Sequence, residues 1–245
     1  MSGKKPELLA PAGSPACARA AFEAGADAVY AGLAKFNARE RGENFDPGTM
    51  AKVVDLAHRT GKKLYLTLNT LVKEQELPEV AELVENIRII GPDALLVQDL
   101  GVLRLVREYF PSLELHASTQ MGFHNSAGFA VAEKLGVTRV VLERQVTLEE
   151  LAEIRKKTSL EIEVFIHGAL CCSLSGMCLF SSYLGGHSGN RGKCKQPCRR
   201  RYFSTSRLSV AISGCCRREN TPSLPTLPAK TAHQCGLPMV RVITT

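Results

Sequence analysis

The sequence lacks long apolar runs and several familiar catalytic signatures. No stretch among the 245 residues approaches the length of a membrane span, and the opening MSGKKPELLAPAGSP has no apolar run of the kind found in a signal peptide. We therefore expect a soluble, cytoplasmic protein with no membrane partner. The motifs G-x-G-x-x-G, HExxH and G-x-S-x-G are also absent. Their absence argues against a dinucleotide-binding turn and against the usual metallo- and serine-protease sites.

Acidic residues are scarce in the last quarter of the chain. Residues 189–245 hold 11 lysines and arginines but a single acidic residue, whereas residues 1–188 hold 20 basic and 23 acidic residues. A basic segment of this kind predicts an anionic partner, with nucleic acid first among the candidates. A solvated or disordered tail is the alternative for the last forty residues. The basic residues that we expect to meet phosphates are Arg191, Lys193, Lys195, Arg199, Arg200 and Arg201.

Seven short apolar runs alternate with amphipathic segments between residues 7 and 168. The runs are apolar on consecutive positions, which is typical of parallel strands buried on both faces. The expected strands are 7–12, 26–32, 63–69, 93–99, 113–119, 139–144 and 162–168. The expected helices are 14–25, 46–61, 77–91, 100–110, 125–136 and 147–158. Glycines at the ends of four helices and the pair Thr147 and Glu150 are typical helix caps.

This alternation predicts an α/β fold, and its even spacing favours a (β/α)8 TIM-like barrel over an open doubly wound sheet. Seven strands are visible and an eighth is not, so we expect an incomplete barrel. A cysteine-rich segment, 167–201, follows the seventh strand within a domain spanning residues 6–203.

Polar residues gather where each expected strand ends. In a barrel these ends converge on one mouth, where active sites lie. Pocket candidates on this reasoning are His116, Gln120, Glu143, Arg144 and His167, and polar groups also follow the earlier strands at Tyr30, Asn69, Gln98, Asp99 and Ser118. The competing interpretation is structural: His116 caps a neighbouring strand, and Glu143 with Arg144 forms a local ion pair.

Five of the nine cysteines lie within residues 171–198, in the spacing Cys171-x6-Cys178-x15-Cys194-x3-Cys198 with Cys172 beside the first. Thiolates bind soft metals, and four of them complete the shell of a [4Fe–4S] cluster. The spacing favours such a cluster, while zinc and redox-active thiols remain alternatives. A cysteine–histidine hydrolase is a weaker interpretation, because nothing selects one nucleophile. Cys17, on the first helix, is expected in the core.

The run EVFIHGALCCSLSGMC resembles the signature of the U32 family of collagenase-like peptidases. The signature residues are Glu163, Phe165, Gly168, Ala169, Leu170, Cys171, Gly176 and Cys178. The segments ELLAPAGSPACARAAFEAGADAVYAGL, NARERGENF, ALLVQDLGVL and HASTQM are similar to this family as well. The resemblance covers about residues 6–203.

The resemblance implies a function other than proteolysis. Members of the family hydroxylate a pyrimidine in tRNA or ribosomal RNA, with prephenate as the implied hydroxyl source, and carry a cysteine-ligated iron–sulfur cluster on a barrel-like domain. The resemblance also implies that Cys171, Cys178 and Cys194 are cluster ligands, with Cys198 as the nearest candidate for the fourth ligand. The alternatives are a peptidase acting on collagen-like chains and an accessory iron–sulfur protein that needs a protein partner for turnover.

Residues 204–245 depart from the family pattern. Serine, threonine and proline are scattered there without period, and we expect no strand or helix. Our hypothesis is an out-of-frame or read-through segment in which Cys215, Cys216 and Cys235 are accidental; a flexible RNA-binding tail is the alternative. On the first hypothesis the barrel stays open between its first and seventh strands. Such a protein is expected to be poorly stable and inactive.

Overall fold

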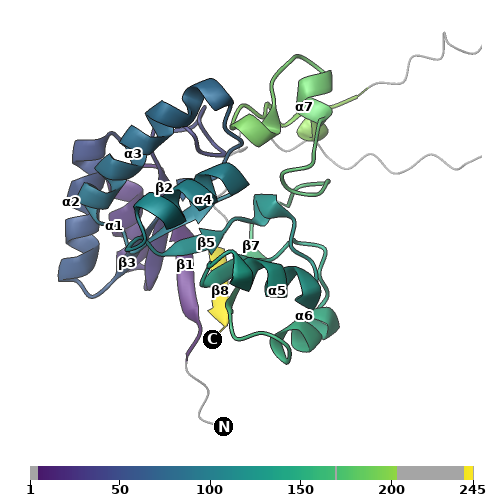
Figure 1. Ribbon diagram of the computed structural model, residues 1–245, viewed down its shortest axis with the longest axis horizontal. Helices are drawn as coiled ribbons and strands as arrows, with labels where there is room; N and C mark the ends of the chain where they lie inside the picture. The colour runs from purple at the N-terminus through teal and green to yellow at the C-terminus, as the bar shows by residue number, and fades with distance from the viewer. Residues whose placement is uncertain (1–4, 169, 203–239, 245) are drawn as a thin grey trace, which may run out of the picture.

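The computed structural model describes residues 5–168, 170–202 and 240–244. Within them, eight strands form a closed barrel in the order β1 to β8, with helices on the outside (Figure 1). Seven strands run parallel to one another: β1 (Glu7–Pro11), β2 (Ala28–Gly32), β3 (Lys63–Leu68), β4 (Ala94–Val97), β5 (Leu115–Ala117), β6 (Arg139–Val141) and β7 (Glu161–His167). The expected α/β barrel is confirmed.

In the described residues, six helices alternate with the strands as the sequence predicted, and a seventh, short helix lies in the cysteine-rich segment. They are α1 (Pro15–Glu23), α2 (Pro47–Arg59), α3 (Leu77–Ile90), α4 (Leu100–Tyr109), α5 (Ser126–Lys134), α6 (Leu148–Arg155) and α7 (Phe180–Tyr183), with short 3-10 turns η1 (Glu74–Glu76), η2 (Thr119–Met121), η3 (Gly189–Arg191) and η4 (Pro197–Arg199). Side chains of Asp46 and Asp99 accept hydrogen bonds from the first turns of α2 and α4. Thr147 and Glu150 form the expected capping box on α6. No helix in these ranges is long and apolar enough to cross a membrane.

The core has two layers. The larger one lies between sheet and helices, where α2 buries Met50, Val53 and Val54. Full burial of such side chains contributes about 1.5–3 kcal/mol each. The smaller layer fills the barrel interior with Leu9, Tyr65 and neighbouring apolar residues. Cys17 lies outside both layers: it is exposed on α1, and its expected burial is wrong.

The eighth strand corrects the expectation of an open barrel. β8 (Val240–Thr244) runs antiparallel to both of its neighbours and closes the sheet between β1 and β7. Val242 pairs with Leu8 on one side and Val164 on the other. The unpaired backbone groups of two edge strands are satisfied by this insertion. The expectation that residues 204–245 hold no strand is wrong for Val240–Thr244, and residues 203–239 lie outside the described ranges together with Cys215, Cys216 and Cys235.

Candidate functional site

The cysteine-rich segment forms a lobe over the barrel, which we call the cysteine lobe (residues 170–202). Figure 1 shows it in light green around α7, beside the rim of the barrel rather than within the ring of helices. It contacts the loops that follow the strands at two places. At both places the lobe contacts polar residues of these loops.

The first contact lies at the ends of β5 and β6. The backbone N–H of Ser175 donates to Glu143 Oε1 at 2.7 Å, and the Arg144 guanidinium donates to the Ser175 hydroxyl. Gly176 fits here only because it lacks a side chain: its φ is +74°, and a Cβ would lie 1.9 Å from the carbonyl oxygen of Gln120. The lobe is therefore packed directly against three of the expected pocket residues.

The second contact lies at the loops after β2 and β3. The Arg191 guanidinium donates to both carboxylate oxygens of Glu76, at 2.5 and 2.7 Å, and to the carbonyl of Leu71 at 2.9 Å. These hydrogen bonds hold the pKa of Glu76 down at about 2. The Leu71 N–H donates to the Asn190 carbonyl at 2.9 Å. At Gly192 a Cβ would lie 2.1 Å from the Asn37 carbonyl, so this contact is also close.

The expected pocket residues divide into three groups. Gln120, Glu143 and Arg144 come together at the mouth, with Arg144 lying 4.2 Å above the ring of Phe165. Glu143 is buried and also accepts from Thr119 Oγ1 at 3.4 Å. His167 is exposed at the end of β7.

His116 lies apart from the mouth group, fully buried in the barrel interior. Its ring contacts Tyr65 edge-on at 5.0 Å, and its Nε2 lies 3.2 Å from Glu114 Oε1. Burial lowers the pKa of His116, and its ring Nε2–H donates to the Glu114 carboxylate. It belongs with the charged network around Arg139, which the sequence analysis did not identify.

The cysteines of the lobe are all free thiols. Cys171, Cys172, Cys194 and Cys198 are exposed and Cys178 is half-buried. Burial and a hydrogen bond with Cys172 raise the pKa of the Cys198 thiol to about 11, and Cys194 lies close enough to add to the shift. Gly189 lies between Cys178 and Cys194: a Cβ there would lie 4.0 Å from Cys194 Sγ and 3.8 Å from the Cys178 carbonyl oxygen.

The chemistry of this donor set fits a soft metal centre. Within residues 170–202 the side-chain donors are five thiols and the His187 imidazole, with no carboxylate among them, because residues 164–218 contain no aspartate or glutamate. In the described part of the chain, no three histidine, cysteine or acidic side chains are arranged around a single metal-ion position. Cys172, which the spacing did not select as a ligand, is the cysteine that lies beside Cys198. Cys171 and Cys172 are adjacent, so the sequence contains no signal that distinguishes one from the other as a ligand.

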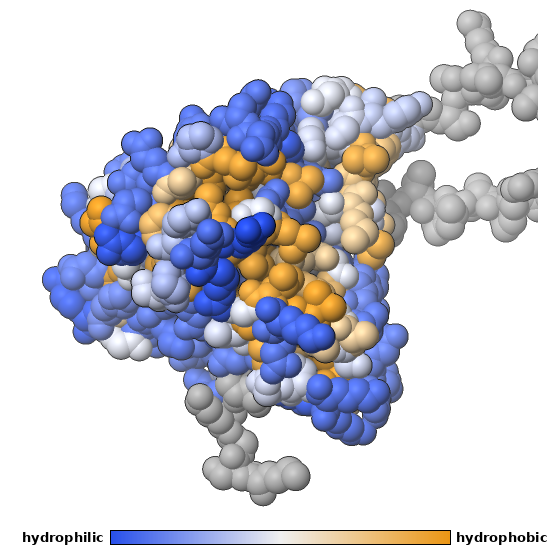
Figure 2. All heavy atoms as spheres, in the orientation of Figure 1, coloured by the Kyte–Doolittle hydropathy of each residue, from blue (hydrophilic) through white to orange (hydrophobic). Residues whose placement is uncertain are grey.

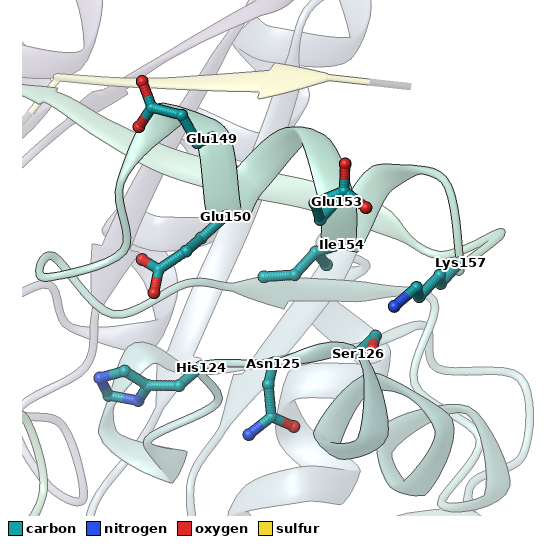
Figure 3. Close-up of a pocket in the computed structure, with 8 residues that line it drawn as sticks. All are labelled: His124, Asn125, Ser126, Glu149, Glu150, Glu153, Ile154 and Lys157. Atoms are coloured by element: carbon teal, nitrogen blue, oxygen red, sulfur yellow. The ribbon is translucent and has the colours of Figure 1, made fainter.

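Two clefts are formed by the described residues. A cleft of about 320 Å³ lies between the start of α5 and α6 and is lined by His124, Asn125, Glu149, Glu150 and Glu153; Glu150 points toward the side of His124, whereas Glu149 and Glu153 point away from it (Figure 3). Glu150 is already engaged in the α6 capping box, so part of this acidic wall is structural. A second cleft of about 160 Å³ at the second lobe contact is lined by ion pairs between Lys35 and Glu79, Arg191 and Glu76, and Lys193 and Glu40.

A parallel α/β barrel with a thiol-rich lobe packed on its mouth defines the class of protein. Comparison with known proteins gives the family. The model of peptidase family U32 matches residues 13–224, and the chain belongs to this family.

Several relatives share this part of the chain. The tRNA hydroxylation protein P of Escherichia coli is 41% identical over 199 residues, covering 81% of this chain and 44% of that protein. The 23S rRNA 5-hydroxycytidine C2501 synthase of E. coli is 42% identical over 202 residues, covering 82% and 30%. A collagenase of Porphyromonas gingivalis is 31% identical over 208 residues, covering 80% and 50%. The chain thus spans half or less of the length of these relatives.

Among solved structures, the U32 peptidase Mk0906 has the same fold with a TM-score of 0.56 at 13% identity, covering 66% of this chain and 68% of that one. This likeness supports the barrel architecture alone. The resemblance to the U32 family that the motif around Cys171 indicated is confirmed.

Proposed function

We propose that this chain takes part in the hydroxylation of a pyrimidine in RNA, with an iron–sulfur cluster held by the cysteine lobe. The observation that carries the proposal is the similarity to two RNA-hydroxylation proteins, at 41% and 42% identity, across both the barrel and the lobe. The proposed ligands are Cys171, Cys178, Cys194 and Cys198. A cluster there would supply electron transfer when bound.

The residues at the mouth suit the binding of an anionic co-substrate. Hydroxylation replaces C–H by C–OH, a two-electron oxidation, so it requires a donor whose own C–OH is reduced to C–H in the exchange; the family resemblance implies the dicarboxylate prephenate as this donor. The half-buried Arg144 guanidinium lies over the face of Phe165 and is oriented by the Ser175 hydroxyl. We propose that it binds a carboxylate of this donor, since arginine matches carboxylates in geometry as well as charge. Glu143, fixed by the Ser175 N–H, keeps the lobe seated beside it.

The first test measures iron and sulfide after anaerobic purification. We expect about four irons per chain and a broad absorbance at about 400 nm, both of which are lost in Cys171→Ala. Cys172→Ala is the matched control, because it removes an adjacent exposed thiol and is expected to keep the iron. The reverse result would move the ligand assignment from Cys171 to Cys172. A protein that holds zinc or no metal would contradict the cluster.

The second test incubates the iron-loaded chain with unmodified RNA and prephenate. We expect an RNA nucleoside that gains one oxygen, detected by mass spectrometry, and a large loss of this product in Arg144→Ala at unchanged iron content. Hydrolysis of collagen-like peptides that survives iron removal and is blocked by a thiol reagent would support a peptidase instead. A cluster with no product until another protein is added would support an accessory role.

A further inference from the structure

The cysteine lobe exposes aromatic side chains that the proposed chemistry does not use. Tyr183 on α7 is 87% exposed, Tyr202 is 60% exposed and Phe180 is 36% exposed. Apolar residues beside them, including Leu179 and Leu184, are also exposed. Figure 2 shows apolar and hydrophilic side chains side by side on the part of the surface where this lobe lies. A concentration of exposed large side chains on one small lobe indicates a binding surface.

These aromatic rings are held in place by contacts within the lobe. The rings of Phe180 and Tyr202 stack with their centroids 6.2 Å apart and their planes at 25°. The Tyr202 hydroxyl donates to the Pro197 carbonyl at 2.8 Å. The Lys195 N–H donates to the Ser181 hydroxyl at 3.0 Å, which ties the chain leading to η4 against α7. The aromatic faces therefore belong to one ordered unit.

The basic residues of the lobe divide into paired and uncompensated charges. Arg191 and Lys193 form ion pairs with Glu76 and Glu40, so their charges are used within the molecule. Lys195, Arg199, Arg200 and Arg201 are exposed, and none of them forms an ion pair with another described residue. All four belong to the segment that runs from Lys195, whose N–H is bonded to Ser181 on α7, to Tyr202, whose hydroxyl is bonded to Pro197.

Positive charge from neighbouring basic residues also acts on His187 in this lobe. Loss of solvent, and then the charges of Lys195, Arg41 and Lys193, lower the pKa of His187. No acidic residue lies between Glu163 and Glu219 in the sequence. A protein partner usually meets a mixture of both charges, whereas a single-stranded nucleic acid offers flat bases and a row of phosphates.

We propose that Tyr183 and the stacked pair Phe180–Tyr202 form a platform on which unpaired bases of RNA stack, while Lys195, Arg199, Arg200 and Arg201 hold the adjoining phosphates. The choice of RNA over DNA rests on the proposed function; the stacking and phosphate contacts rest on the lobe itself. Because the platform lies on the same lobe as the thiols, it would present an unstacked strand to the site without base-specific contacts.

The test measures binding of the full chain to a fluorescently labelled single-stranded oligoribonucleotide and to an abasic oligomer of equal length. We expect Tyr183→Ala to weaken binding of the base-containing strand about fivefold or more and to leave the abasic oligomer unaffected. Tyr109→Ala is the matched control, because Tyr109 is also a highly exposed tyrosine, 67% exposed at the end of α4 and not part of the lobe. Equal affinities of these two variants for the base-containing strand would overturn the platform and favour a protein partner for this surface.

The charged residues give a separate result. The double substitution Arg200→Ala and Arg201→Ala should weaken binding of both oligomers and reduce the dependence of affinity on salt, whereas Arg104→Ala, at an exposed position of α4, should change neither. Unchanged binding of both oligomers by the double variant would contradict the phosphate contacts.

A fluorescent reporter checks the stacking directly. The chain has no tryptophan, so Tyr183→Trp introduces a single one, and we expect added RNA to quench its emission. Emission unchanged at saturating RNA would overturn the stacking. These binding measurements need neither iron nor prephenate: Tyr183-dependent binding without hydroxylation would reject the proposed function alone, and hydroxylation with Tyr183-independent binding would reject the platform alone.

Discussion

Charged side chains are buried inside the barrel, where most neighbouring residues are apolar. Arg139 on β6 is 2% exposed and donates to Glu161 Oε2 at 2.8 Å from its Nε. It also lies 3.4 Å from Glu7 Oε1 and 4.8 Å above the Tyr65 ring, and Tyr65 itself donates to Glu7 at 2.6 Å. Buried charges are tolerated only as a fully paired set, because their desolvation is not otherwise offset.

Arg139→Ala should therefore lower the free energy of unfolding by about 3–5 kcal/mol, because it removes the guanidinium from Glu161 and from the fully buried Glu163, while Glu7 keeps its ion pair with Lys63. Urea denaturation followed by circular dichroism measures this difference. Arg104→Ala serves as the surface control and should change the stability by less than about 0.5 kcal/mol. A loss below about 1 kcal/mol for Arg139→Ala would contradict a buried network that depends on this residue.

His116 gives the fold a pH dependence with a definite sign. Burial lowers its pKa in the folded state from 6.5, whereas the unfolded chain keeps the ordinary value. Below about pH 6.5 the unfolded state binds more protons than the folded state. The contribution of His116 to the free energy of unfolding is therefore fully present above that pH and is lost as the pH decreases. We expect His116→Asn to flatten this part of the stability–pH curve in urea titrations. A curve of unchanged slope in the variant would assign the acid sensitivity to other groups.

At the scale of elements, the position of the cysteine lobe depends on close contact between backbones. Gly176 and Gly186 both have positive φ, at +74° and +70°, but only Gly176 lies against another segment. The ion pair between Arg191 and Glu76 holds the other side of the lobe. The lobe is thus fixed by two contacts to loops on different sides of the barrel mouth.

Gly176→Ala should detach this side of the lobe, because the added Cβ would meet the Gln120 carbonyl at 1.9 Å. The expected sign is faster hydrogen exchange at the Ser175 amide, which loses its bond to Glu143. Gly186→Ala carries a similar backbone strain of about 1–2 kcal/mol but has open space around its Cβ. Equal exchange rates at Ser175 in both variants would show that the close approach does not hold the lobe.

At the scale of the whole molecule, closure of the barrel depends on its last strand. β8 pairs with both β1 and β7, and it is the antiparallel member of an otherwise parallel barrel. Two strands far apart in sequence share it as a common partner, so its loss would expose both of their edges at once.

Removal of residues 240–245 should therefore lower the melting temperature and cause concentration-dependent aggregation, because the backbone groups of β1 and β7 would become available to other chains. Thermal denaturation and light scattering measure the two effects. Removal of Thr245 alone is the control and should leave both unchanged. A shortened chain that melts and scatters like the full chain would show that β8 contributes nothing to closure.

Local patterns in the sequence were sufficient for the parallel strands, the outer helices and the family. Strands buried on both faces, the cap at Thr147 and the glycine ends of helices each depend on neighbouring residues, so they can be predicted without the fold. The positions of Glu143 and Arg144 at the barrel mouth follow from the same logic. The cysteine spacing likewise indicated a thiol site.

Other features were decided by contacts between distant residues. β8 is a short run in a segment without clear period, and it becomes a strand because β1 and β7 leave an edge on each side of it. Arg191 binds Glu76, 115 residues away in the sequence. Arg200 has no such acidic partner among the described residues, although the sequence gave no reason to distinguish the two arginines. His116 follows the pattern of a mouth residue, yet its place in the strand turns it into the interior. Pairing, burial and charge compensation are properties of the folded chain, and one-dimensional spacing does not contain them.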